Sequence, residues 1–311
     1  MLLKEKIPFK YIFGKIRYES MFMLAYTLVV CGLFEYANLT RISIPLTVPA
    51  IVGTVLSLLL GFRSNQAYDR WWEARHIWGA IVNDSRSLAR QVMCFMHQDY
   101  PNSEMQKLKS RIIKRQVGWT FSLGQALRGQ NPVKGLDKYL NPTELETVAH
   151  YSNIPMAILS MHASDIQEAL DNGYINEYQQ VELDRTLSRL CDSQGKAERI
   201  KNTVFPSTYG LYIHFALMLF VAMLPFGLID IFGLATIVVV PVIASCFFLI
   251  EKMAIHLQDP FENKPTDTPV TTIARTIERD LWQMMLDNNK PKAEANFATT
   301  PTAAQAHYYV L

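Results

Sequence analysis

The chain has 311 residues, 50% of them hydrophobic, and a formal net charge of +2. These totals alone leave a soluble two-domain protein open, but the distribution of charge excludes it. Residues 42–62, 202–229 and 231–250 contain no Asp, Glu, Lys or Arg. Each run matches or exceeds the roughly 20 apolar residues that a helix needs to cross a bilayer.

The N-terminal segment 1–19 is positively charged, and a first span is predicted directly after it. Between Glu19 and Glu35 lie 15 uncharged residues, which reach spanning length when both glutamates lie at the membrane interfaces. Together with the run 42–62, this predicts two membrane helices within residues 20–62.

The second span carries two neighbouring stripes of residues that repeat every four positions. One stripe is built from small residues: Gly53, Ser57 and Gly61. Such stripes let helix backbones approach closely in a bilayer, so we expect either contact between copies of the chain or ordinary packing within one subunit. The adjoining stripe, one residue on, consists of Thr54, Leu58 and Phe62. If the small residues join copies together, this second stripe points at a shared axis.

Residues 63–201 are predicted to form a helical domain. The second span continues as one helix to about residue 96, because residues 64–96 contain no Gly or Pro except Gly79. A loop is expected at 129–142. Further helices are predicted at 104–127, from an N-cap at Asn153 to Gly173, and at 175–200.

The third and fourth spans are predicted within residues 202–250. Residues 251–287 are expected to form a C-terminal helical segment, in which Thr268 caps a helix that begins at Pro269. The tail 288–311 is rich in Ala, Thr and Asn, and we expect it to be disordered.

Lysine and arginine residues decide the orientation of the spans. They gather in the N-terminal segment, in the helical domain and in the C-terminal part, whereas the two short links between spans hold only Arg41. The positive-inside rule therefore places both termini and the helical domain in the cytoplasm. A cleaved signal peptide is not expected, because the first apolar run starts late and no small-residue cleavage site follows it.

The residues directly after the second span combine charges with tryptophans, as in a belt at the membrane surface. Arg63 lies near the inner membrane edge and needs a carboxylate, a carbonyl or water, because an unpaired charge is costly there. Alternatively, its side chain extends along the helix to the surface. Structural ion pairs are predicted for Arg63, Asp69, Arg70, Glu73 and Arg75.

The sequence contains no motif for catalysis or for binding a cofactor or metal. The four cysteines lack a CxxC pair, the seven histidines lack ligand spacing, and neither a nucleotide-binding glycine loop nor a nucleophile elbow occurs. We therefore expect no enzyme activity, no cofactor, no metal and no nucleic-acid partner. His214, within the third span, is expected to form an interhelical hydrogen bond.

Residues 61–79 are similar to the motif that follows the second span of bestrophins, particularly the bacterial members. The matching positions are Gly-Phe-Arg at 61–63, Tyr68, Arg70, Glu73-Ala-Arg75 and Trp78-Gly79. Two distant groups carry the same resemblance. They are Glu198-Arg199 with Pro206 and Tyr209, and Asp259-Pro-Phe261 with Asp267, Pro269 and Ile277-Glu-Arg279. The resemblance covers residues 20–285.

The resemblance to bestrophins implies an all-α membrane protein with four transmembrane helices per subunit and a helical cytoplasmic domain, assembled as a homopentamer around a central pore. The positions that match the hydrophobic neck of the family are Thr54, Leu58 and Phe62. Counting back from Glu198-Arg199 places a cytoplasmic aperture at Tyr178.

Most characterised bestrophins conduct chloride or other small anions, so the resemblance implies an anion channel, in a bacterial inner membrane. An uncharged neck does not indicate whether anions or cations pass through the pore. A monovalent cation channel of the same fold and a non-conducting membrane scaffold therefore stay open.

Two departures from the family pattern change these expectations. The first neck position is usually apolar, whereas Thr54 brings a hydroxyl that eases wetting. Animal bestrophins have an acidic run that helps to bind calcium, whereas residues 262–267 include Lys264, whose ammonium group opposes a bound cation. We therefore expect no activation by calcium, and we expect Asp267 to cap a helix or to lie in an interface.

Overall fold

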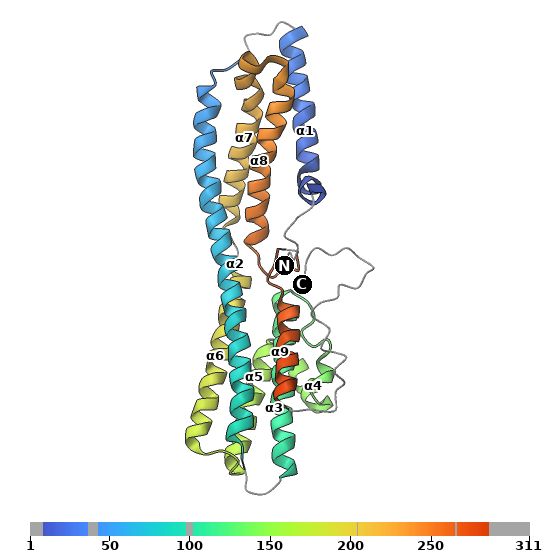
Figure 1. Cartoon of the computed structure of the whole chain (residues 1–311), viewed down its shortest axis with the longest axis vertical. Coiled ribbons are helices and arrows are strands. Elements are labelled where there is room, and N and C mark those ends of the chain that lie inside the picture. The colour runs from blue at the N-terminus through green and yellow to red at the C-terminus, as the bar shows by residue number, and fades with distance from the viewer. Residues whose placement is uncertain (1–8, 37–42, 98–101, 204, 265, 286–311) are drawn as a thin grey trace. The chain divides into compact units, whose positions relative to one another are not determined.

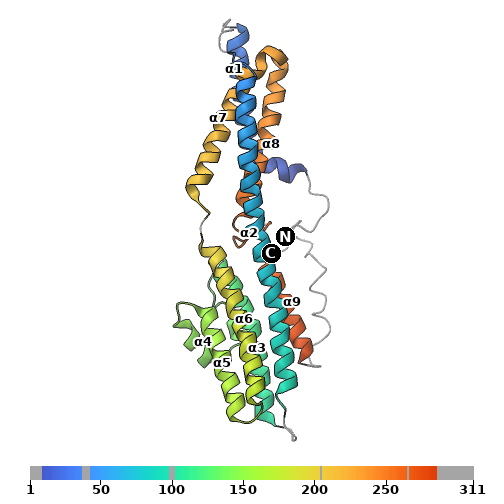
Figure 2. The same ribbon diagram turned by 90° about the vertical axis from the view of Figure 1, so that its left-hand side faces the viewer.

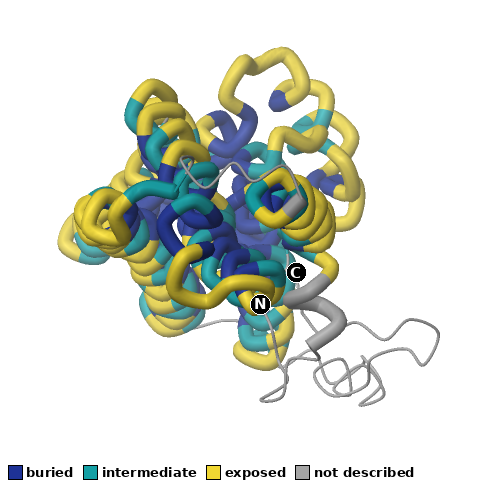
Figure 3. Tube along the Cα trace, turned by 90° about the horizontal axis from the view of Figure 1, so that it is seen from above, coloured by how far each residue is buried: buried dark blue, intermediate teal, exposed yellow. Residues whose placement is uncertain are grey.

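The structure, a computed structural model, describes residues 9–36, 43–97, 102–203, 205–264 and 266–285. In these ranges the chain consists of α-helices and short 3-10 turns without a strand, so the predicted all-α fold is confirmed. The helices divide into two compact units. The long helix α2, Thr47–Phe95, contributes to both, because the division falls after Trp71. Buried and exposed stretches alternate along the helices, as expected where one side of each helix packs on others (Figure 3).

The first unit, called the membrane unit here, consists of α1 (Phe9–Tyr36), α2 as far as Trp71, α7 (Ser207–Phe232) and α8 (Thr236–Leu257). Helix α8 packs against α1 and α7, and the three lie side by side in Figure 1. The core of the unit is apolar and draws on all four helices. It includes Met23, Leu56, Leu60, Leu217 and Phe248.

Helices α7 and α8 fold back on each other around Gly233. This glycine has a φ angle of 53°, in the left-handed region that favours glycine, and it ends α7. By length and apolar composition, three helical stretches in the described part of the chain are able to cross a membrane: Gly14–Glu35, Thr47–Phe95 and Ser207–Leu257. The last stretch contains both α7 and α8, so the described residues include four helices of spanning length, as the sequence predicts.

The second unit, called the polar unit here, contains α2 from Trp72 onward and the charged helices. Figure 2 shows α3 (Ser103–Leu127), α5 (Ile154–Asp171) and α6 (Glu177–Asn202) side by side, and α9 (Val270–Met284) packs on α3. Trp119 is fully buried in the core of this unit. Its indole N–H donates to Gln194 Oε1 at 3.2 Å, so the buried donor is satisfied.

Asparagine side chains begin four helices of the polar unit. Asn102, Asn141, Asn153 and Asn176 accept backbone N–H groups from the first turns of α3, α4 (Pro142–Ala149), α5 and α6. The predicted cap at Asn153 is thereby confirmed, and so is the continuous helix through α2. Helix α4 was not predicted. The capping box that Asn141 forms with Glu144 was the signal for it in the sequence.

The predicted cap at Thr268 is wrong. Helix α9 begins at Val270, with Pro269 at the N-cap position and no side-chain cap. Thr268 is buried, and its carbonyl accepts the Val270 N–H at 2.8 Å, because the chain makes a tight turn there that directs the side chain inward. The tail predicted to be disordered, 288–311, lies outside the described residues, as do residues 1–8.

Candidate pore surface

Within the membrane unit, α2 has a packed face and an uncovered face. Leu56 and Leu60 on the packed face are each 1% exposed and belong to the core shared with α7 and α8. Leu58 and Phe62, by contrast, are 60% and 52% exposed. Residues four apart lie on one side of a helix, offset by about 40°. Thr54 is also exposed, so all three predicted neck residues lie on the uncovered face.

Thr54 differs from its two neighbours on this face because it carries a hydroxyl. That hydroxyl donates to the Ala50 carbonyl oxygen at 2.9 Å, which is a bond within α2 itself. The hydroxyl proton is therefore used in this hydrogen bond. The exposed side of Thr54 offers oxygen lone pairs and a methyl group, but no free donor.

The structure separates the three small residues of the predicted packing stripe. A Cβ atom added at Gly53 would lie 2.8 Å from the Phe220 ring of α7, so Gly53 packs within the subunit. Gly61 has no atom within 4 Å of that position, and Ser57 is exposed, with its hydroxyl donating to the Gly53 carbonyl at 2.8 Å. Only Ser57 and Gly61 are therefore open to contact with another chain.

A buried charge cluster joins three membrane helices. Arg63 of α2 is 4% exposed and Glu251 of α8 is 3% exposed, and the Arg63 Nη1 atom lies 3.8 Å from the Glu251 Oε1 atom. His214 of α7 contacts the same carboxylate, with Nδ1 3.0 Å from Oε1. The expected interhelical contact of His214 is thus present. Arg63 also lies against Gly210, where a Cβ atom would come within 3.2 Å of the guanidinium.

The other four residues of the predicted ion-pair set behave differently from one another. Arg70 Nε donates to the Gln258 carbonyl at 2.8 Å, and Glu73 pairs with Arg199 at 2.7 Å on the surface of the polar unit. Among the described residues, no group of opposite charge lies within 4.0 Å of the charged group of Asp69 or of Arg75. For these two residues the predicted ion pairs are absent from the described part of the chain.

The uncovered face of α2 becomes polar after Phe62. Asn65, Gln66 and Asp69 are exposed there. Asp69 is seven residues from Phe62, about two helical turns, and so points to the same side at an axial distance of about 10 Å. A single face of α2 thus carries apolar residues followed by polar ones, among them the carboxylate of Asp69.

Tyr178, the predicted aperture residue, is the second residue of α6 and is 85% exposed. Its helix turn is held by the capping box of Asn176 and Gln179. Val181, one turn further, is 54% exposed. Tyr178 therefore lies on a capped helix start, and the described residues leave its side chain largely uncovered.

In the segment 262–267, which the resemblance matches to the acidic run of animal bestrophins, the glutamate is paired with lysines. Glu262 lies 3.2 Å from Lys201 Nζ and 3.7 Å from Lys264 Nζ, and the hydrogen bond from Lys201 lowers the pKa of this carboxyl group. Asp267 is 1% exposed and accepts the Lys264 backbone N–H at 2.9 Å. Burial raises the pKa of Asp267. Asp267 stabilises this turn and does not cap a helix.

Sequence reasoning missed a basic surface on α3. Lys107, Arg111 and Lys114 recur at helical spacing, and this spacing was the available signal. They face a cavity whose other wall comes from the connection into α4, and that neighbour was not predicted.

Comparison with known proteins identifies the relatives of this chain. Residues 9–283 match the sequence profile of the family described as Bacterial/Fungal Bestrophin protein. A voltage-dependent anion channel-forming protein of Nostoc sp. is 29% identical over 259 residues, which cover 81% of this chain and 84% of that protein. The voltage-dependent anion channel-forming protein YneE of Escherichia coli K12 is 29% identical over 268 residues, 86% of each chain.

A solved structure has the same fold. The crystal structure of a bacterial bestrophin homologue from Klebsiella pneumoniae superimposes with a TM-score of 0.82, covering 89% of this chain and 100% of that one, at 24% sequence identity. This likeness extends over both units of the described chain.

Proposed function

Because the chain belongs to the bacterial/fungal bestrophin family, we propose that it forms a homopentameric channel that conducts small anions, chloride above all, through a central pore. The observation that carries the proposal is the uncovered apolar face of α2 with Thr54, Leu58 and Phe62. Around a symmetry axis each of these positions becomes a ring. Rings of Leu and Phe offer a passing ion no hydrogen bond, so the neck gates by wetting and dewetting.

Two further features support the details of this proposal. The curated relatives are called anion channel-forming proteins, which supports anions as the permeating species. The distribution of Lys and Arg supports an inner-membrane protein with both termini and the polar unit in the cytoplasm. In this arrangement Tyr178 lines a second, cytoplasmic constriction.

The decisive experiment is electrical recording from purified protein in planar bilayers. Under a salt gradient, the current is expected to reverse at the equilibrium potential of chloride. If the bilayers show no single-channel events although the protein is inserted, the chain is a membrane scaffold and the proposal fails.

A cation channel is the second candidate, and exposed Asp69 favours it. An acidic ring about two turns beyond the neck would concentrate cations at the pore. Asp69→Asn removes this charge without changing the size of the side chain. A wild-type reversal potential near that of the cation, moved toward chloride by Asp69→Asn, would establish the cation channel in place of the anion channel.

Assembly through α2 gives a prediction of its own. Gly61→Leu and Ser57→Leu are expected to break the oligomer, because both positions are open within the subunit and a larger side chain pushes neighbouring backbones apart. Native mass spectrometry measures the number of subunits. Gly32→Leu on α1, which also meets no atom within 4 Å, is the matched control. An unchanged oligomer in both α2 variants would contradict assembly through this stripe.

Calcium is expected to have no effect on the open probability. Lys201 and Lys264 already neutralise Glu262, and the Asp267 carboxylate is buried in a turn, so the described part of this segment does not present the several accessible oxygen ligands that calcium needs. Recordings with and without micromolar calcium on the cytoplasmic side test this. A severalfold activation that Asp267→Ala abolishes would show the expectation to be wrong.

A further inference from the structure

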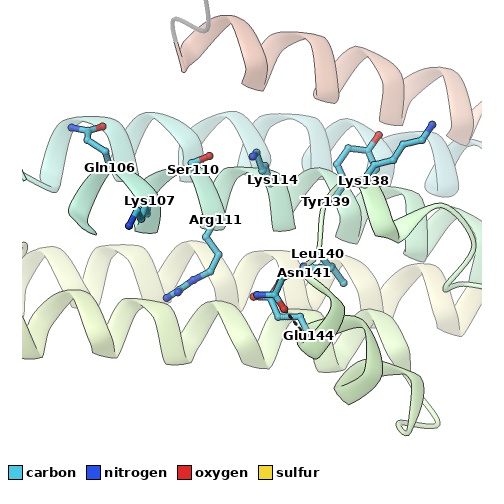
Figure 4. A pocket seen from close by; sticks show the side chains of 10 residues that line it. All are labelled: Gln106, Lys107, Ser110, Arg111, Lys114, Lys138, Tyr139, Leu140, Asn141 and Glu144. Carbon is cyan, nitrogen blue, oxygen red and sulfur yellow. Dashed lines mark hydrogen bonds between the residues drawn. The ribbon is translucent and has the colours of Figure 1, made fainter. Parts of the chain in front are cut away.

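A cavity of about 600 Å³ lies in the polar unit, where the connection from η2 (Leu136–Lys138) into α4 passes beside the N-terminal half of α3. Nine of its ten lining residues carry a charged or hydrogen-bonding side chain. Figure 4 shows Lys107, Ser110, Arg111 and Lys114 in a row along α3, with Asn141 on the opposite wall. We call this space the α3–α4 cavity. Its volume falls within the range of roughly 300–1,000 Å³ that is usual for small-molecule sites.

The residues that line the cavity include more cations than carboxylates. Four cationic side chains line it, Lys107, Arg111, Lys114 and Lys138, against one carboxylate, Glu144. Glu144 is already paired with Arg115, a residue of the core that is 3% exposed. The one acidic group in the wall is therefore neutralised from behind. Arg111 and Lys107 have carboxylate partners outside the lining, so the cationic charges of the wall that no described carboxylate pairs are those of Lys114 and Lys138.

The four cations differ in how they are held. Arg111 is fixed by Asp165, at 2.9 Å, and by Glu168, so its guanidinium has a set position. Lys107 forms an exposed pair with Glu104, which is easily exchanged for another anion because such pairs contribute only about 0–1 kcal/mol. No carboxylate of the described residues lies within 4.0 Å of the ammonium group of Lys114 or Lys138.

The spacing of these groups suits an extended, multiply charged anion better than a halide. Lys107, Arg111 and Lys114 span seven residues of one helix face, about 10 Å along the axis. A chloride ion is too small to cover this distance. Lysine ammonium groups bind phosphate as point charges, and hydroxyl and amide donors such as those of Ser110 and Asn141 complete the contacts of phosphate oxygens.

We propose that the α3–α4 cavity binds a phosphorylated anion of at least diphosphate size. Arg111 forms the fixed part of the site, and Lys114 and Lys138 supply two positive charges that no carboxylate of the described residues pairs. This site lies in the polar unit and is distinct from the neck on α2, so it does not depend on the ion that the pore conducts.

The test uses the full-length protein in detergent with inorganic pyrophosphate as the probe. Isothermal titration calorimetry is expected to show saturable binding of one pyrophosphate per subunit. The double variant Lys114→Gln/Lys138→Gln is expected to weaken this binding at least tenfold. The matched control is Lys134→Gln/Lys196→Gln, which removes two exposed lysines outside the cavity and changes the net charge equally. It is expected to change the affinity less than twofold.

Three results would overturn the proposal. The first is the absence of saturable binding at millimolar pyrophosphate. The second is an equal loss of affinity in both double variants, which would mean that the general positive charge attracts the probe and no site exists. The third is a changed subunit number in the cavity variant without any pyrophosphate binding in the wild type, which would make this surface a contact between copies.

Discussion

Replacing Leu58 and Phe62 together by Ala is expected to increase the ionic current severalfold and to leave the melting temperature unchanged. Both side chains are more than half exposed in the subunit, so their removal opens no cavity in its core. In the proposed pore they force an ion to shed water in an apolar ring, which is very costly. Trimming both rings widens and wets the neck, and flux therefore rises. Bilayer recording and thermal unfolding on the same preparation measure the two effects.

Leu56 and Leu60 provide the matched control on the same helix. Each is 1% exposed and packed against α7 and α8, so Leu→Ala there is expected to cost about 2–5 kcal/mol of stability without a gain in current. If the Leu58/Phe62 variant instead loses stability and gains no current, these side chains pack in an interface and do not line the pore.

Arg63→Met is expected to lower the stability of the protein strongly. Among the described residues, Glu251 would then be left as a buried carboxylate, 3% exposed, with His214 as its remaining partner. Removal of one partner from a buried ion pair costs about 3–5 kcal/mol. The double variant Arg63→Met/Glu251→Met removes both charges and is expected to recover most of the loss. Melting temperatures of the detergent-solubilised variants form a double-mutant cycle that measures this coupling.

Lys252→Met is the control for the charge cluster. Lys252 pairs with Glu19 at 2.5 Å, but both side chains are about a third exposed, so water can replace the lost partner. A much smaller fall in melting temperature is therefore expected. If Arg63→Met is no more harmful than Lys252→Met, the Arg63–Glu251 contact does not hold α2 against α8.

The sequence by itself determined the features that depend on groups within one helix. Uncharged runs predicted the membrane helices, because a bilayer requires a minimum apolar length whatever the neighbours are. The absence of helix breakers predicted the continuous α2, and the polar side chain of Asn153 predicted the start of α5. The four-residue repeat of Thr54, Leu58 and Phe62 placed these residues on one face, because helical geometry is local.

Only the tertiary structure decided which residues of other helices each helix face contacts. Periodicity grouped Gly53 with Ser57 and Gly61, but the Phe220 ring of α7 packs on Gly53 and not on Gly61. The partner of Arg63 is a glutamate on α8, far along the chain, and nothing near Arg63 in the sequence identifies it. The α3–α4 cavity likewise exists because the connection into α4 passes beside one face of α3. Side-chain spacing shows which residues share a side of a helix, whereas burial and pairing depend on helices that are brought together only by folding.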